Sequence, residues 1–134
     1  MLEQDADPQL RSTEQSMAPS MAISNAIARV HKQYVGRGPT HARTTIDGVM
    51  VVSLLEGGYT QAEQTLEDTD KGDLVAAGRL GLQEAMREEM IDAVQRTLGR
   101  RVHSFMSAND LHRNLQVEVF VLEEEADIGP PLER

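Results

Sequence analysis

The stretch from Gly36 to Arg43, GRGPTHAR, constrains the fold most because it separates a helical pattern from a strand pattern. Upstream of it, apolar residues recur at the spacing of one helical face: Ile23, Ile27, Val30 and Tyr34. We expect this helix to begin between residues 16 and 20. Gly36 suits its C-cap, and Pro39 cannot continue it. The chain must therefore turn here and begin another kind of element.

The element that follows is predicted to be a β-hairpin. Residues 42–47 and 49–55 have the composition of two strands, and the Asp47-Gly48 pair between them is typical of a two-residue turn. The second strand is nearly all apolar, so we expect it to lie centrally in a sheet. Val51 and Leu55 should then be buried.

The second half of the chain contains two predicted helices and two further strands. Thr60-Gln61-Ala62-Glu63 is a capping-box pattern and predicts a short helix over 60–68. A long helix should follow, with Asp73 as N-cap and an end at Gly99. Its expected buried stripe is Leu82, Met86, Met90, Val94 and Leu98. Strands are predicted over 102–107 and 115–122, joined by a polar turn over 108–114.

The order of helix, Gly-Arg and hairpin occurs twice, either as a true internal repeat or as a chance recurrence of a common plan. Both readings predict an α+β fold of two helix–β-hairpin units. The four strands should form a mainly antiparallel sheet with the helices packed on one face. We expect a single domain over 16–123, flanked by disordered acidic tails at 1–15 and 124–134.

Charge and composition narrow the classes of function. The formal net charge of −9 argues against nucleic acid as a partner, because neutralising phosphates needs a basic face. No apolar run approaches the roughly 20 residues that span a bilayer, so we expect no direct membrane span. The chain has no cysteine, which suits a reducing cytoplasm.

Positive charge is concentrated in two windows without acidic residues, 15–46 and 93–109. In a functional reading, residues from these windows bind an anion or a partner's carboxylate. In the alternative, the glycines cap helices and the arginines bond helix carbonyls and nearby acids. The candidate contact residues are Arg37, Gly38, Thr40, His41, Arg43, Arg100 and Arg101.

No pattern for catalysis or metal binding stands out. The four histidines lack the spacing of a metal site, and the sequence has no cysteine and no GxSxG nucleophile motif. We therefore expect no catalytic residue, no metal and no cofactor.

Four segments together resemble a known bacterial family: ISNAIARVHKQYVGRGPTHART, VVSLLEGGYTQAEQTL, QEAMREEMIDAVQRTLGRRVHSFMS and LQVEVFVLE. The family is named for the C protein (MpsC) of a Na+-translocating membrane-potential-generating system. The GRGPTHAR turn and the LEGGYTQAE joint carry most of the resemblance. It implies a soluble accessory of a membrane cation-handling system and supplies no catalytic residue.

These observations lead to one expected function and one alternative. We expect a cytoplasmic, non-catalytic accessory or regulatory protein that can contact a protein partner at the membrane. We also expect a homodimer, formed through a sheet edge or the long helix. The alternative is a regulatory module that binds a small anion at the corner of Arg37, His41 and Arg43.

Overall fold

The computed structural model describes residues 17–124 of the chain, so the tails predicted at 1–15 and 124–134 lie outside the described residues, except for Glu124. None of the helices within residues 17–124 is long and apolar enough to cross a membrane. The elements, in chain order, are α2 (Pro19–Val35), β2 (His41–Asp47), β3 (Met50–Glu56), α3 (Gln61–Asp68), α4 (Gly72–Leu98), β4 (Val102–Asp110), the 3-10 helix η1 (Leu111–Arg113) and β5 (Leu115–Leu122).

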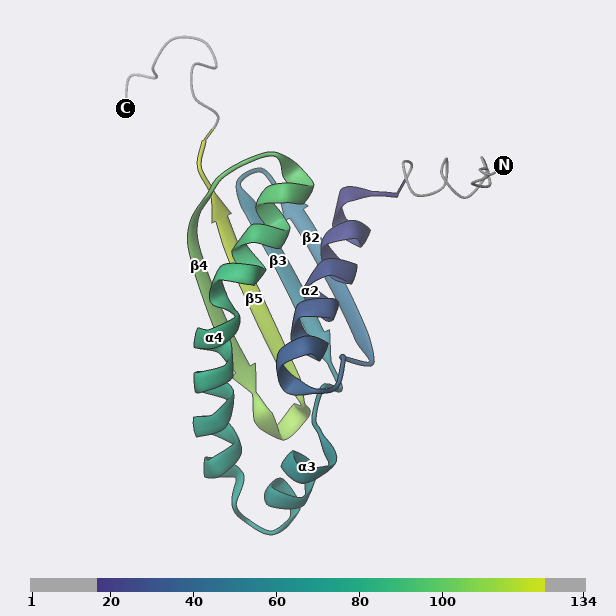
Figure 1. The fold of residues 1–134 in the computed structure, drawn as a ribbon, viewed down its shortest axis with the longest axis vertical. Coiled ribbons are helices and arrows are strands. Elements are labelled where there is room, and N and C mark those ends of the chain that lie inside the picture. Colours follow the sequence, from purple (N-terminus) through teal and green to yellow (C-terminus); the bar gives the residue numbers. More distant parts are fainter. Residues whose placement is uncertain (1–16, 125–134) are drawn as a thin grey trace, which may run out of the picture.

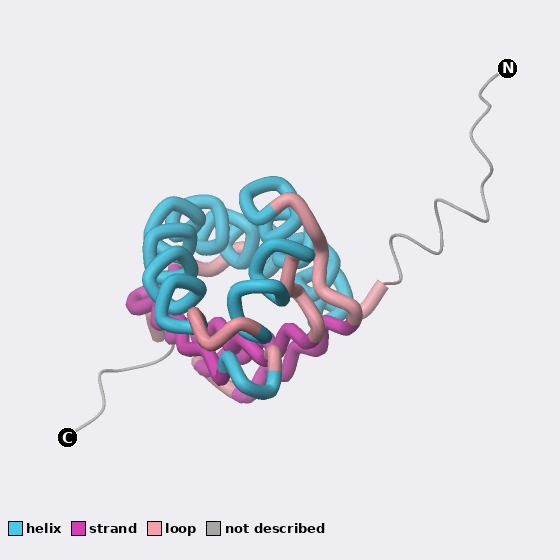
Figure 2. The backbone as a smooth tube through the Cα atoms, turned by 90° about the horizontal axis from the view of Figure 1, so that it is seen from below, coloured by secondary structure: helices cyan, strands magenta, loops and turns pink. Residues whose placement is uncertain are grey.

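The four strands form one antiparallel sheet in the order β2-β3-β5-β4. The nearly apolar β3 is central, as predicted, and lies between β2 and β5. Helices α2 and α4 lie side by side on one face of the sheet (Figures 1 and 2). The predicted α+β fold, with a four-stranded antiparallel sheet and helices on one face, is confirmed.

The hairpin between β2 and β3 forms, but its turn lies one residue later than predicted. Asp47 stays in the ladder opposite Met50, so the two central residues are Gly48 and Val49. Gly48 has a φ of 61°, and Val49 is not among the residues with positive φ. A positive φ at the first central position alone is the pattern of a type II′ turn, which favours glycine there.

We expect Gly48→Val to lower the free energy of unfolding by about 1–2 kcal/mol, because a β-branched residue resists a positive φ. A Cβ at this position would meet no atom within 4 Å, so the effect should come from the backbone alone. Urea denaturation measures it. Gly48→Asn should recover much of the loss, because asparagine tolerates this conformation; equal losses for both variants would contradict the explanation.

Helix ends follow the sequence signals at Gly36, at Gly99, which caps α4 as predicted, and at the start of α3, and they depart from them at the start of α4. Gly36 caps α2 with a φ of 94°, and its N–H donates to the Lys32 carbonyl. Thr60 and Glu63 form the predicted capping box of α3. Asp73, however, is not the N-cap of α4: the helix begins at Gly72, so Asp73 lies in the first turn. Its charge still favours the helix there, through the helix dipole.

The polar turn predicted over 108–114 is shorter than expected, because β4 continues to Asp110. Ala108, Asn109 and Asp110 pair with β5, so residues of low strand propensity are held by the ladder. The chain reverses through η1 and Asn114, which has a φ of 55°.

The core lies between the sheet and the α2–α4 pair. Val51 and Leu55 are 0% and 2% exposed, as predicted. From the predicted stripe of α4, Met86, Met90 and Val94 are buried, while Leu82 and Leu98 are partly buried against the core. The rings of Phe105 and Phe120 lie 4.9 Å apart between centroids.

Because side chains alternate along a strand, half of the sheet residues point away from α2 and α4. We call this side the open face. On this face the central strands β3 and β5 carry mostly apolar residues, and the charged residues lie on the edge strand β2 and at the ends of the strands. On β2 and β3 the open face carries His41, Arg43, Thr45, Asp47, Met50, Val52, Leu54 and Glu56, and on β5 and β4 it carries Leu115, Val117, Val119, Val121, Ser104, Met106, Ala108 and Asp110.

Candidate functional site

Two of the predicted contact residues, Arg37 and Thr40, line one hollow of about 330 Å³ beside the N-terminus of α3. We call it the Arg37 hollow. Arg37 is exposed, and its Nη1 donates to the Tyr59 carbonyl over 3.1 Å. Thr40 donates to the Gly57 carbonyl over 3.3 Å. None of the described residues that line the hollow has a carboxylate; the others are Gly57, Tyr59, Thr60, Gln61, Gln64 and Asn114.

The remaining predicted residues do not join this hollow. A Cβ added at Gly38 would lie 3.7 Å from the Lys32 Cβ, so Gly38 faces that side chain. His41 and Arg43 are exposed on the open face, since their neighbours Ala42 and Thr44 point toward the helices. The structure therefore separates Arg37 from the other two members of the predicted corner.

Arg100 and Arg101 lie at the other end of the sheet, where α4 meets β4. Arg100 donates to the Glu123 carbonyl over 3.0 Å, and Arg101 Nε lies 3.9 Å from a Glu123 carboxylate oxygen. They therefore share no site with Arg37.

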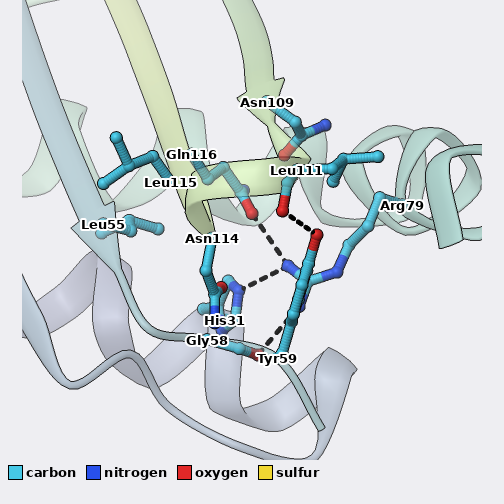
Figure 3. A pocket seen from close by; sticks show the side chains of 10 residues that line it. All are labelled: His31, Leu55, Gly58, Tyr59, Arg79, Asn109, Leu111, Asn114, Leu115 and Gln116. Carbon is cyan, nitrogen blue, oxygen red and sulfur yellow. Dashed lines mark hydrogen bonds between the residues drawn. The ribbon is translucent and has the colours of Figure 1, made fainter. Parts of the chain in front are cut away.

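The polar centre of the molecule is a residue that the sequence analysis did not single out. Arg79 of α4 is 3% exposed and points into a cluster between α2, α3 and β5 (Figure 3). A guanidinium has five N–H donors, and all five are used. Its acceptors are both Glu63 carboxylate oxygens at 2.7 and 2.8 Å, the Gly58 carbonyl at 2.8 Å, Gln116 Oε1 at 2.9 Å and His31 Nε2 at 3.1 Å.

Glu63 joins the capping of α3 to this cluster. One carboxylate oxygen accepts the backbone N–H of Thr60 over 3.0 Å, while both oxygens accept from Arg79. Burial alone would raise the pKa of Glu63, but the hydrogen bonds from Arg79 and Thr60 outweigh burial and lower it. Glu63 is therefore held as a carboxylate, and the bidentate pair fixes α3 against α4.

The partners of His31 determine its tautomer. The guanidinium of Arg79 can only donate, so His31 Nε2 accepts; the Arg37 carbonyl can only accept, so Nδ1 carries the proton. The imidazole is thus neutral. Burial lowers the pKa of His31, and the positive charge of Arg79 lowers it further. His31 thereby connects the buried arginine to the backbone of the loop that carries the Arg37 hollow.

Gly58 and Tyr59 complete the cluster from the loop before α3. A Cβ on Gly58 would lie 2.8 Å from the His31 ring, so only glycine lets this carbonyl reach Arg79. The Tyr59 ring lies 5.7 Å from the Arg79 guanidinium carbon, and its hydroxyl donates to the Leu111 carbonyl. Burial raises the pKa of Tyr59 to about 12, so the phenol stays protonated.

A row of polar side chains crosses the helix-facing side of the sheet. Thr44, Ser53, Glu118 and Ser107 lie in register on β2, β3, β5 and β4. Ser24 of α2 bonds Thr44 over 2.7 Å, and Thr44 bonds Ser53 over 2.8 Å. On the other side of the row, Ser107 donates to Glu118.

Glu118 is 1% exposed and links the row to the arginine cluster, because Gln116 accepts from Arg79 and donates to Glu118. Burial raises the pKa of Glu118 to about 7, against the opposing effect of its bonds to Ser107 and Gln116. Hydrogen bonds thus connect His31 of α2 to Ser107 of β4 through Arg79, Gln116 and Glu118.

The geometry divides the polar groups into two kinds. The ten residues drawn in Figure 3 enclose only about 10 Å³, which is about the space of one water molecule, and the donors of Arg79 are all used within the protein. This cluster therefore holds four elements together. The Arg37 hollow is open and large enough for a small ligand.

One sequence signal pointed to Arg79. It lies seven residues before Met86, on the same helical face, so the buried stripe of α4 extends back through Gln83 and Arg79 to Val75. His31 likewise lies four residues after Ile27 on the inner face of α2. Glu118 follows the alternation of β5, with Phe120 and Leu122 on the same side.

Comparison with known proteins places nearly all of the described fold in one family. A family model described as "Na+-translocating membrane potential-generating system (MpsC)" matches residues 19–124. The uncharacterized protein YrhF of Bacillus subtilis is 26% identical over 107 residues, covering 78% of this chain and 88% of YrhF. The uncharacterized protein YbcI of the same organism is 32% identical over 111 residues, covering 70% of this chain and 89% of YbcI. No solved structure matches the chain significantly.

Proposed function

Because this chain belongs to the MpsC family of the Na+-translocating membrane potential-generating system, we propose that it is a non-catalytic accessory or regulatory protein of such a membrane system. It acts as a homodimer and contacts a protein partner at the membrane without spanning it. The lack of cysteine suits the reducing cytoplasm, so we place it on the cytoplasmic side.

One observation carries the non-catalytic part of this proposal. Polar and ionisable side chains gather around Arg79, as they do in many active sites, yet they form hydrogen bonds to one another. All five donors of Arg79 have protein acceptors, and the neutral His31 uses both ring nitrogens. A group with no free donor or acceptor cannot bind a transition state, so this network supports a structural role.

Affinity purification from the native host tests the accessory role. The tagged chain is captured from membranes solubilised in mild detergent, and the co-purifying proteins are identified by mass spectrometry. We expect an integral membrane protein of a cation-handling system to be enriched over a capture with an unrelated tagged acidic protein. Equal recovery of membrane proteins in both captures would contradict the proposal.

The Arg37 hollow favours a second candidate function, the binding of a small anion. A cation beside the N-terminus of a helix, where none of the lining residues among 17–124 has a carboxylate, is a favourable environment for negative charge in a chain whose net charge is −9. The site then consists of Arg37 and Thr40, without His41 and Arg43.

We expect Arg37→Ala to weaken binding of inorganic phosphate by roughly 10- to 150-fold, because a charge-assisted hydrogen bond contributes about 1.5–3 kcal/mol. Isothermal titration calorimetry at low salt measures the Kd. Arg43→Ala is the matched control, since it removes the same charge from the open face. Equal affinities of the two variants, or no binding by the unmodified chain, would contradict the proposal that the Arg37 hollow binds a small anion.

A further inference from the structure

We propose that the open face of the sheet is the interface of the homodimer, packed face to face against the open face of a second copy. The proposal gives a surface to the homodimeric state proposed above, and it is independent of the membrane partner. It also moves the contact from the sheet edge or long helix, expected from the sequence, to the broad side of the sheet.

The composition of the open face supports a buried role. Its two central strands present an uninterrupted apolar block: Met50, Val52, Leu54, Val117, Val119 and Val121. Met50 and Met106 are 47% and 53% exposed. Because β3 and β5 are adjacent, the block is continuous, and α2 and α4 are packed on the other side (Figure 2). Contiguous apolar surface of this kind marks an interaction site.

The shape of the face indicates that the occupant is another copy. An apolar hollow of about 250 Å³ lies toward one end of the face, lined by Leu54, Ala108 and Val117 among others. The protruding Met50 and Met106 lie toward the other end. A half-turn about an axis across the strands exchanges the two ends, so that Met106 of the second copy lies over the hollow at Ala108. The same contact is made twice, as a two-fold interface requires.

The charges agree with this arrangement. The half-turn brings Asp47 of the second copy opposite His41, and Thr45 of the second copy opposite Arg43. The other acidic residues, Glu56 and Asp110, then face Met50 and Ser104 of the second copy. No two like charges oppose one another, and Asp47 of each copy lies within reach of His41 and Arg43 of the other. Such self-complementarity specifies a second copy better than an unrelated apolar partner.

Sedimentation velocity at micromolar concentration tests the interface. We expect the unmodified chain to be dimeric and Met106→Glu to raise the dimer Kd at least about tenfold, because it places a charge in the apolar contact. Leu80→Glu is the control: Leu80 is 67% exposed on α4, away from the open face, so this variant should stay dimeric. Circular dichroism checks that both variants are folded.

A charge exchange tests direct contact between the copies. Within one copy, Arg43 and Asp47 are four residues apart on β2, about 13 Å, too far for a hydrogen bond. In the proposed arrangement Asp47 of one copy lies over His41 of the other, one same-face position along β2 from Arg43. Arg43→Glu and Asp47→Arg should therefore each weaken the dimer, and the double variant should restore it only if the two positions meet across the interface. A monomeric unmodified chain would overturn the homodimer. A dimer that survives Met106→Glu, or one weakened equally by Leu80→Glu, would overturn this interface alone, and neither outcome bears on membrane capture.

Discussion

Replacing Arg79 with Ala is expected to lower the free energy of unfolding by about 3–5 kcal/mol, the range found when one partner of a buried ion pair is removed. The change leaves the Glu63 carboxylate without its bidentate partner and leaves the Gly58 carbonyl and Gln116 Oε1 without a donor. A buried acceptor that loses its partner carries the full cost of its desolvation. Equilibrium unfolding in urea, followed by circular dichroism, measures the loss.

Two further variants separate the geometry of Arg79 from its charge. Arg79→Lys keeps a positive charge but has three donors instead of a five-donor fork, so we expect it to recover only part of the lost stability. Arg96→Ala removes an exposed arginine from the same helix and should change stability by no more than about 0.5 kcal/mol. If Arg79→Ala were as mild as Arg96→Ala, the network would not be holding α3, α4 and β5 together.

The elements of this fold could be predicted from local sequence because their signals act over a few residues. Gly36 ends α2 through its own positive φ, and Thr60 and Glu63 cap α3 across three residues. The prediction of Asp73 as N-cap was wrong because aspartate is favourable both at the N-cap and in the first turn of a helix, so the residue type does not distinguish the two positions. The strand order depends on whether β4 or β5 pairs with β3, and packing over the whole sheet, not a local pattern, decides this.

The candidate site was predictable only where its residues are close in the chain. Arg37 and Thr40 share a hollow because they belong to one short turn. His41 and Arg43 lie nearby in sequence, but strand alternation sends them to the open face. Arg79 gathers partners from residues 31 to 116, and no local pattern encodes such distant contacts. An arginine in a buried stripe also reads as an interruption of the stripe, unless its acceptors are known.

The buried carboxyl of Glu118 should make the protein less stable as the pH rises from about 4.5 to about 7. Burial raises its pKa from the usual 4.5 to about 7 in the folded protein. Between these values the unfolded chain has released the proton and the folded chain keeps it, so the folded state binds more protons and stability falls with rising pH. Glu118 contributes fully below pH 4.5, and its contribution is lost above pH 7.

The size of this effect follows from the difference between the two pKa values. Each unit corresponds to 1.36 kcal/mol, so the free energy of unfolding should fall by about 3 kcal/mol across this window from Glu118 alone. His31 acts in the opposite direction: its pKa is lowered, so its contribution is present above pH 6.5 and is lost as the pH falls. The unmodified chain shows the sum of both, which hides part of the Glu118 effect.

Glu118→Gln isolates the carboxyl, because the amide has nearly the same shape and does not titrate. Urea unfolding of both proteins at several pH values between 4.5 and 7 gives the difference in stability, in which the contribution of His31 cancels. As the pH rises from 4.5 to 7, we expect the free energy of unfolding of the variant to increase by about 3 kcal/mol relative to that of the unmodified chain. Glu88→Gln, an exposed change on α4, controls for the loss of one negative charge. Parallel stability curves for the unmodified chain and Glu118→Gln would mean that the carboxyl ionises at its usual pH despite its burial, and the polar row would then hold a charged carboxylate.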